Sequence, residues 1–351
     1  MKILIKNGKV WDGEKFIYSD ILTEDQKIIK IDRSIAHSAD FIFDAKNKIV
    51  SAGLIDIHTH LFGVSCDAFG FSADLCSIPF GVTTVADASA VQNDQNVLNS
   101  AMVKSFVFVC SDIKNDEVRF DFTYKMMKCY EEKVVGIKVY FDTTMAEIKS
   151  EKTLYQVVNF AEKNHLKVMV HTSNSPCSME QIVRILRRGD ILTHCFHSGK
   201  NNCTENNFQA FKEAQKKGVI MDAGMAGNVH MDFGYMRNSI ANGFLPDTIS
   251  SDITRCSAYT RGGRYSLLMC MEIAKKLGMK EEDVFRSVTS NASKALGKNC
   301  GKLSVGSNAD IAVLDEVNEP FLLVDKSGNV VESQQNYKCV LTILNNQILY
   351  K

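Results

Sequence analysis

Short apolar runs alternate with amphipathic stretches through the middle of the chain. Runs rich in Val, Ile and Leu recur at residues 54–61, 83–88, 105–110, 136–141, 167–171, 191–196, 218–223 and 248–253. Stretches with a helical spacing of apolar residues lie between several of these runs, for example at 154–164, 179–188 and 208–217. Strands that are apolar along their whole length are typical of a parallel sheet covered on both faces. Strand–helix units repeated over about 250 residues fit a TIM-like (β/α)8 barrel, so we predict an α/β protein of this class.

Both ends of the chain have a different pattern. Residues 1–50 hold short apolar runs separated by Asn-Gly and Asp-Gly turns, and similar runs fill residues 309–314 and 338–349. Because the two termini of a domain often lie near each other, we predict one small β-sandwich built from both termini. The predicted domains are residues 1–52 with 301–351 for the sandwich, and residues 53–300 for the barrel.

An open, doubly wound sheet is the alternative fold for alternating strands and helices. Such folds usually carry a glycine-rich phosphate-binding turn after a strand. No G-x-G-x-x-G follows residues 54–61, and no G-x-x-x-x-G-K-[S/T] occurs in the chain. The pattern therefore favours the barrel.

Charge and composition exclude several classes of protein. The 351 residues include 41 Lys and Arg against 41 Asp and Glu, so a basic nucleic-acid-binding surface is not expected. No apolar run approaches the ~18–20 residues of a membrane span. The N-terminal run is interrupted by Lys and Gly, unlike a secretion signal. The eleven cysteines include no C-x-x-C pair, which indicates reduced thiols in a cytoplasmic protein.

Polar residues interrupt the apolar runs at or near the carboxyl ends of the predicted strands. They are His58 and His60 on the first strand, Lys138 on the fourth, His171 on the fifth, His194 on the sixth and Asp252 on the eighth. The carboxyl ends of the strands in a barrel meet at its active-site face. We therefore expect these side chains to converge.

The residue types and spacing favour a metal site over isolated core residues. His58 and His60 are two residues apart on one strand, so both rings can reach one ion. Lys138 lies within an apolar strand, where a charged ammonium pays a large desolvation cost. A neutral lysine can react with CO2, and the resulting carbamate has two oxygens that can bridge two cations. Each of these residues also has a simpler interpretation when it is taken singly. A histidine is then a core residue with its hydrogen bonds satisfied, Lys138 is an ion-paired lysine, and Asp252 is an aspartate in a turn.

Several motifs together resemble the amidohydrolase superfamily. They are residues 52–60 (AGLIDIHTH), 136–138 (GIK), the two later histidines, Asp252 and residues 305–314 (VGSNADIAVL). Within the superfamily the chain is similar to the amidohydrolase/deacetylase branch related to dihydroorotase. The segments that carry this closer resemblance are residues 81–88 (GVTTVADA), 188–196 (RGDILTHCF) and 243–252 (GFLPDTISSD).

The resemblance implies a binuclear metal centre, most simply with two Zn2+ ions. His58, His60 and Asp252 would hold one ion, His171 and His194 the other, and a CO2-derived carbamate on Lys138 would bridge them. A hydroxide shared by the two ions would attack the carbonyl of an amide or acyl ester. Asp252 would act as general acid/base, taking the proton and passing it to the leaving group. Deacetylation of a small, carboxylate-bearing substrate is the favoured reaction.

One segment departs from the family pattern, and it bears on substrate binding. Related sequences often carry Gly-His-Gly after the seventh strand, whereas residues 222–228 here read DAGMAGN. Met225 at that place suggests another substrate contact, for which His230 and Asn228 are candidates. Arg255, Arg261 and Arg264 follow Asp252 closely, and we expect one of them, Arg255 or Arg261 first, to bind a substrate carboxylate. A solvated basic loop is the alternative for these arginines.

Rival functions remain open at this stage. A cyclic amidohydrolase such as dihydroorotase usually has an arginine two residues after the second histidine, where this chain has Phe62. A deaminase usually lacks the bridging lysine. A non-catalytic oligomeric scaffold on the same fold tends to lose metal ligands, and all six are present here. We therefore expect a hydrolase with a small-molecule substrate, no nucleic-acid or membrane partner, and a possible homo-oligomeric state.

Overall fold

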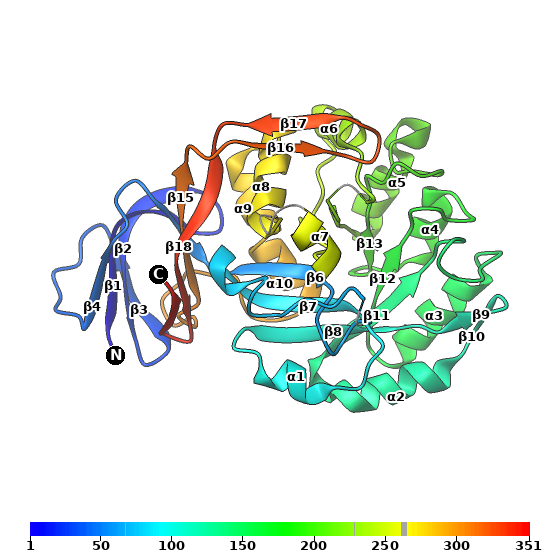
Figure 1. Cartoon of the computed structure of the whole chain (residues 1–351), viewed down its shortest axis with the longest axis horizontal. Helices are drawn as coiled ribbons and strands as arrows, with labels where there is room; N and C mark the ends of the chain where they lie inside the picture. The colour runs from blue at the N-terminus through cyan, green and yellow to red at the C-terminus, as the bar shows by residue number, and fades with distance from the viewer. Residues whose placement is uncertain (67, 228, 261–264) are drawn as a thin grey trace.

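A curled parallel sheet forms the centre of the molecule (Figure 1). The computed structural model describes residues 1–66, 68–227, 229–260 and 265–351. Each strand of the sheet pairs in parallel with the next one along the central region. In order, the strands are β6 (Leu54–Thr59), β7 (Val82–Ala90), β8 (Lys104–Cys110), β11 (Val134–Tyr140), β12 (Lys167–His171), β13 (Ile191–Thr193) and β14 (Ile220–Met221). The α/β class and seven of the predicted barrel strands are therefore confirmed.

The eighth predicted strand, at residues 248–253, is not formed as a strand. Instead, Thr248 makes an isolated parallel bridge to Asp222, and Ile253 makes one to Thr59. The segment thus links the two edges of the seven-stranded sheet. Asp252 has a left-handed backbone conformation (φ 50°), which interrupts an extended run. This kink is the physical reason that the apolar pattern overpredicted a strand here.

Helices lie outside the curled sheet and cover it (Figure 1). Helix α3, for example, buries Leu154, Val157 and Ala161 on one face, and the side chains of Ser178 and Gln181 form a capping box at the start of α4. The α-helices are α1 (Gln95–Ser100), α2 (Phe120–Tyr130), α3 (Lys152–Lys163), α4 (Met179–Ile185), α5 (Glu205–Lys217), α6 (Phe233–Ala241), α7 (Arg255–Thr260), α8 (Leu267–Lys276), α9 (Glu281–Ser287) and α10 (Ser290–Leu296), with 3-10 turns η1 (Ile78–Phe80) and η2 (Glu131–Lys133).

Both ends of the chain join one eight-stranded sheet beside the central one (Figure 1). Its strands are β1 (Ile3–Trp11), β2 (Phe16–Glu24), β3 (Lys27–Asp32), β4 (Phe41–Asp44), β5 (Ile49–Ala52), β15 (Ile311–Val317), β18 (Asn336–Leu344) and β19 (Gln347–Tyr350). β5 is the junction, because it pairs with both β1 and β15. The predicted two-layer sandwich is not confirmed, since the pairings join these strands into a single sheet.

Two short hairpins complete the described elements. One is formed by β9 (Ile113–Lys114) and β10 (Glu117–Val118), and the other by β16 (Phe321–Val324) and β17 (Val330–Ser333). The β16–β17 hairpin crosses above α8 to reach α6 (Figure 1), where Asp325 accepts a hydrogen bond from the Phe233 amide at 2.6 Å. The C-terminal region is thereby attached to the helices around the central sheet.

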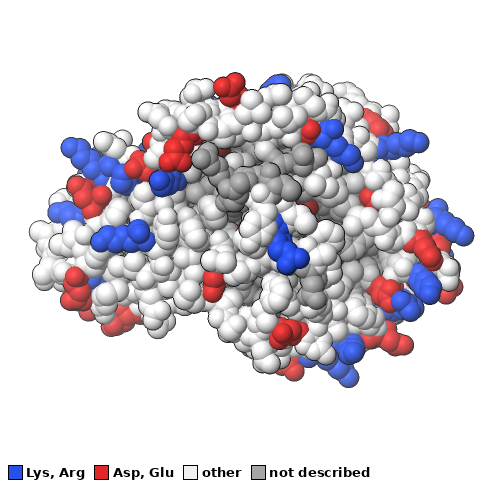
Figure 2. All heavy atoms as spheres, viewed as in Figure 1, with Lys and Arg blue, Asp and Glu red and all other residues white. Residues whose placement is uncertain are grey.

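Charged side chains of both signs lie on the visible face of the molecule. Acidic and basic side chains are interspersed around the face shown in Figure 2, with no large patch of one sign among the described residues visible there. Of the helices in the described ranges, none is long and apolar enough to cross a membrane. Among the described residues no disulfide joins the cysteines, and most of them are buried.

Candidate metal centre

The predicted polar residues converge in one cavity at the carboxyl ends of the central strands. The cavity has a volume of about 490 Å3. His58 lies in β6, Lys138 in β11 and His171 at the last position of β12, while His194 directly follows β13. The cavity lining includes all the predicted ligands and one further histidine: His58, His60, Lys138, His171, His194, Asp252 and His230. Their convergence follows from the parallel sheet, which brings all its carboxyl ends to one side.

Asp252 lies at the meeting point of three histidines. Its Oδ1 is 2.9 Å from His60 Nε2 and 3.3 Å from His58 Nε2, and its Oδ2 is 3.8 Å from His194 Nε2. Lys138 is completely buried, and its Nζ lies 3.0 Å from His58 Nε2. The lysine nitrogen therefore sits within the cluster, where the sequence predicted a bridging group.

The ring of His58 is oriented by a buried series of hydrogen bonds. Its Nδ1 lies 3.0 Å from Thr193 Oγ1, and the Thr193 hydroxyl donates a 2.7 Å hydrogen bond to Asp222. Asp222 also accepts hydrogen bonds from the hydroxyls of Thr248 and Ser250. Hydrogen bonds to the remote nitrogen fix the orientation of metal-binding histidines. This series leaves His58 Nε2 directed toward Lys138 and Asp252.

His60 has an equivalent support on the other side of the cavity. Its Nδ1 lies 3.0 Å from Ser65 Oγ and 3.1 Å from Ser89 Oγ. The Ser65 hydroxyl in turn donates to Asp87, which also accepts the backbone amide of Leu61. His60 is therefore held by two hydroxyls and a buried carboxylate, with its Nε2 directed toward Asp252.

His194 and Asp252 both have left-handed backbone conformations, with φ of 59° and 50°. Such conformations cost non-glycine residues roughly 1–3 kcal/mol and gather at functional sites. The His194 ring is fixed by a 2.6 Å hydrogen bond from Nδ1 to the Gly224 carbonyl. Gly224 allows this close approach, because a Cβ at that position would lie 2.3 Å from Thr193 Oγ1 and 2.8 Å from His194 Nδ1.

The close approach at Gly224 leads to a testable prediction. We expect Gly224→Ala to lower metal affinity and kcat/KM by at least about 10-fold, because the added methyl group displaces His194 and Thr193. Gly243→Ala is the matched control: Gly243 also has a positive φ (82°), but a Cβ there meets nothing within 4 Å. Metal titration and steady-state kinetics of both variants would check this. Equal losses in both variants would assign the effect to backbone strain.

Burial sets the protonation states of the cluster. It lowers the pKa of His58 and of His171 to about 4, so these rings are neutral at neutral pH and have a free lone pair. It also lowers the pKa of Lys138 to about 8, which brings the amine close to its neutral, nucleophilic form. Burial opposes ionisation of Asp252, but the neighbouring His58 and His60 bring its pKa below the usual value. Neutral imidazoles and an ionised carboxylate are the states that bind a divalent metal.

Unsatisfied buried atoms show that the residues fit such an ion. His194 Nε2 and Asp252 Oδ1 are buried without a hydrogen-bond partner among the described residues. The 2.9 Å approach of His60 Nε2 to Asp252 Oδ1 is not aligned as a hydrogen bond. Buried polar atoms are normally paired, and imidazole nitrogen and carboxylate oxygen are both ligands of Zn2+. A cation at this place would satisfy both atoms.

Comparison with known proteins gives the family. The model of the amidohydrolase family matches residues 49–349, which is most of the chain. The chain belongs to the amidohydrolase family.

The chain is similar to two deacetylases over most of its length, and it has the fold of several solved structures. A deacetylase of Enterococcus faecalis is 26% identical, and the match covers 99% of this chain and 98% of the relative. A deacetylase of Brucella anthropi is 25% identical over 89% of this chain and 83% of the relative. A solved adenine deaminase has a TM-score of 0.89 at 24% identity, covering 99% of both chains, and a solved dihydroorotase has 0.87 at 22% identity, covering 99% and 97%. The structural likenesses show that this amidohydrolase shares the fold of these enzymes.

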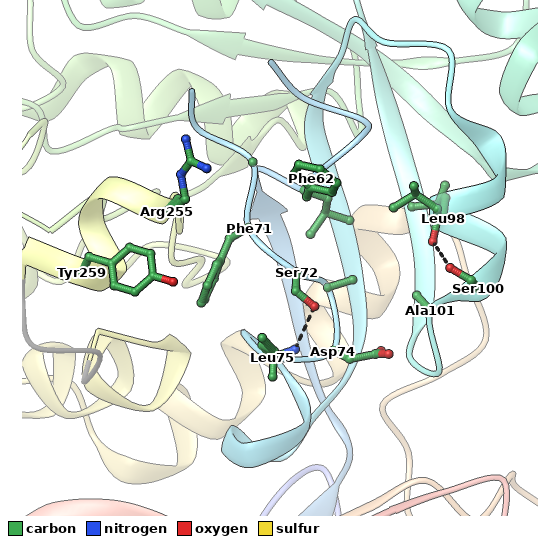
Figure 3. Close-up of a pocket in the computed structure, with 14 residues that line it drawn as sticks. Phe62, Phe71, Ser72, Asp74, Leu75, Leu98, Ser100, Ala101, Arg255 and Tyr259 are labelled. Atoms are coloured by element: carbon green, nitrogen blue, oxygen red, sulfur yellow. Dashed lines mark hydrogen bonds between the residues drawn. The ribbon is translucent and has the colours of Figure 1, made fainter. Parts of the chain in front are cut away.

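Unlike the candidate ligands, the residues expected to contact the substrate do not all lie in the same cavity. His230 lines the cavity that holds the candidate ligands, whereas Asn228, Arg261 and Arg264 lie outside the described residues. Arg255, the first residue of α7, is exposed and lines a neighbouring cavity of about 330 Å3 with Phe62, Phe71 and Tyr259 (Figure 3). The position of Arg255 therefore gives no support to the expectation that it binds a substrate carboxylate, because it lines this second cavity and not the one with the candidate ligands.

Sequence reasoning missed the residues that orient the ligands. Asp87 lies within β7, Asp142 follows β11 and Asp222 follows β14, and all three are buried. Their signal was the same as that of the ligands, since a charged residue at the carboxyl end of an apolar run is expected to face the active site. Ser65, Ser89 and Thr193 had no such signal, because small hydroxyl residues are common both in buried strands and in the turns that follow them.

Proposed function

We propose that this chain is a metal-dependent hydrolase that removes an acyl group from an amide or ester of a small molecule. The observation that carries the proposal is the convergence of histidines and an ionised Asp252 around a fully buried Lys138. The names of the Enterococcus faecalis and Brucella anthropi relatives, both deacetylases, favour acyl hydrolysis.

In this proposal the site holds two divalent ions, most simply Zn2+, in a (β/α)8-type barrel. His58, His60 and Asp252 would hold one ion, His171 and His194 would hold the other, and a CO2-derived carbamate on Lys138 would supply oxygen ligands to them. When bound, the ions would polarise the substrate carbonyl and lower the pKa of the attacking water. The neutral amine that burial favours at Lys138 is the form that reacts with CO2.

Asp252 is the proposed general acid/base. Its carboxylate is ionised at neutral pH, so it can accept the proton of the attacking water. The same proton then passes to the leaving nitrogen or oxygen. His60 Nε2 and His58 Nε2 lie 2.9 and 3.3 Å from its Oδ1, so the carboxylate lies among the proposed ligands.

The experiment is an activity screen of protein purified with Zn2+ and bicarbonate. The substrates are N-acyl and O-acyl small molecules, with and without a carboxylate, together with dihydroorotate and hydantoins. We expect release of the acyl group, measured as free acid, and little opening of the cyclic substrates. Ring opening without acyl release would contradict the deacetylase proposal.

The mouth of the cavity adds a prediction about the substrate. Phe69, Met145 and Val229 line it from three separate loops and are 49%, 54% and 50% exposed. Large apolar side chains this exposed gain stability when a ligand covers them. We therefore expect kcat/KM to rise with the size of an apolar group beside the scissile bond.

A pair of phenylalanine variants tests the apolar mouth. Phe69→Ser should lower kcat/KM for a substrate with a phenyl group by about 10-fold, and change it little for a methyl analogue. Phe62→Ser is the matched control, because Phe62 is 51% exposed but lines the neighbouring cavity. An equal effect of both substitutions, or none with either substrate, would contradict the role given to Phe69.

A further inference from the structure

A fifth histidine of the cavity completes a second possible metal site. His230 lies in the loop between β14 and α6, and its ring centroid is 4.4 Å from that of His194 and 4.8 Å from that of His171. One ligand atom from each of these three residues lies within 4.8 Å of the others. The three nitrogen ligands of a tetrahedral Zn2+ lie roughly 3.4 Å apart at bond lengths of about 2.1 Å. Small rotations of the rings would therefore bring all three onto one ion.

The hydrogen bonds of the three rings indicate which nitrogen of each ring is left to bind an ion. His171 Nε2 lies 3.3 Å from Asp142 Oδ2, His194 Nδ1 bonds the Gly224 carbonyl at 2.6 Å, and His230 Nδ1 lies 2.9 Å from Ser173 Oγ. Each ring thus uses one nitrogen for a carboxylate, carbonyl or hydroxyl and keeps the other for the cavity. This division is the usual arrangement of metal-binding histidines. The nitrogens left for an ion are His171 Nδ1, His194 Nε2 and His230 Nε2.

One ring of this group has an unpaired nitrogen, which fits a ligand role. His194 Nε2 is one of the buried atoms without a hydrogen-bond partner in the described part of the chain. The three ring centroids lie 4.4 to 4.8 Å apart, so an ion bound among the rings would also satisfy His194 Nε2.

We propose that His230 is a third imidazole ligand of the ion held by His171 and His194. The proposal rests on the proposed function, because it assumes that the cavity binds metal. The proposal also means that only one of the two metal sites needs Lys138. The three-histidine site is complete without Lys138, whereas His58 Nε2 of the other site lies 3.0 Å from the unmodified Lys138 amine. The site of His171, His194 and His230 is therefore expected to fill first, before Lys138 is carboxylated.

Metal binding without turnover tests the role of His230. We would titrate metal-free protein with Co2+ and Zn2+ against a chelator of known affinity and record the Co2+ absorption spectrum. His230→Gln should lower the affinity for one of the two ions by more than about 100-fold and change the Co2+ spectrum, since it removes a ligand. Ser173→Ala keeps all three rings but removes the hydroxyl beside His230 Nδ1, so it should lower the affinity for the same ion by about 10-fold.

The control is another buried histidine of the same region. His197 is 1% exposed, its Nδ1 accepts the Gly199 amide at 3.1 Å, and it belongs to neither group of converging ligands. We expect His197→Gln to keep both ions at wild-type affinity, with circular dichroism confirming the fold of every variant. In CO2-free buffer the wild type should bind one ion per chain, and His230→Gln should bind none tightly.

The outcomes separate this proposal from the proposed function. Wild-type protein that binds two ions, together with His230→Gln protein that binds them equally well, would overturn the ligand role of His230 and leave the hydrolase proposal intact. A raised KM with unchanged metal affinity would likewise overturn it and make His230 a substrate contact. Wild-type protein that binds no divalent ion in any buffer would overturn the proposed function itself.

Discussion

Replacement of Asp252 by Asn is expected to lower kcat by at least ~10²–10⁴-fold while most of the bound metal remains. Asn keeps the shape of the side chain and one ligating oxygen, but it cannot accept the proton of the attacking water. The carboxylate is needed more in the transition state than in the ground state, so KM should change little. Steady-state kinetics and elemental analysis of the same preparation would check both parts.

His58→Asn is the comparison for this variant. His58 is expected to serve only as a ligand, so its loss should remove metal and activity together. An Asp252→Asn enzyme with near wild-type turnover would show that another group carries the proton. Parallel loss of metal in the two variants would instead make Asp252 mainly a ligand.

Lys138→Ala is expected to reduce activity to background. Lys138 is completely buried among the ligands, with its Nζ 3.0 Å from His58 Nε2, so its removal takes away the proposed bridging group and leaves a cavity. A short carboxylate such as formate or acetate fits that space and offers the same two oxygens as the carbamate. We therefore expect added carboxylate with metal to restore part of the activity.

Lys167→Ala is a matched control on a neighbouring strand. Lys167 begins β12, and its Nζ donates to the carbonyls of Lys294 and Ala295 at the end of α10. Its loss should lower stability, measured as the melting temperature, without a change in metal content or rescue by formate. Near-normal activity and metal content in Lys138→Ala would make Lys138 an ordinary strand lysine.

The sequence predicted the strands best where burial alone decides them. The run 167–171 was matched residue for residue by β12, because its apolar side chains are buried on both faces of the sheet. The run 191–196 was predicted too long, since β13 ends at Thr193 and the next residue, His194, turns to a φ of 59°. The strand predicted at residues 248–253 was wrong for the same reason, because Asp252 has a φ of 50°. Both errors fall on candidate ligands, where backbone strain overrides the local pattern.

The candidate ligands could be predicted because they are large polar residues in apolar strands. The residues that orient them could not all be predicted, because their role depends on contacts between distant strands. Thr193 Oγ1 lies between His58 and Asp222, and no pattern along the chain records that contact. The position of Arg255 could not be predicted from the sequence either. Helix α7 lines both cavities, and the spacing from Asp252 does not indicate which of them the Arg255 side chain faces.

The most direct test of the binuclear centre is the number of metal ions per chain. Protein prepared with Zn2+ and bicarbonate would be freed of loosely bound metal and measured by elemental analysis together with its specific activity. The convergence of His58, His60, His171, His194 and Asp252 around Lys138 predicts two tightly bound ions per chain at full activity. Full activity in protein that never holds more than one tightly bound ion would contradict the bridging role of Lys138 and the binuclear mechanism.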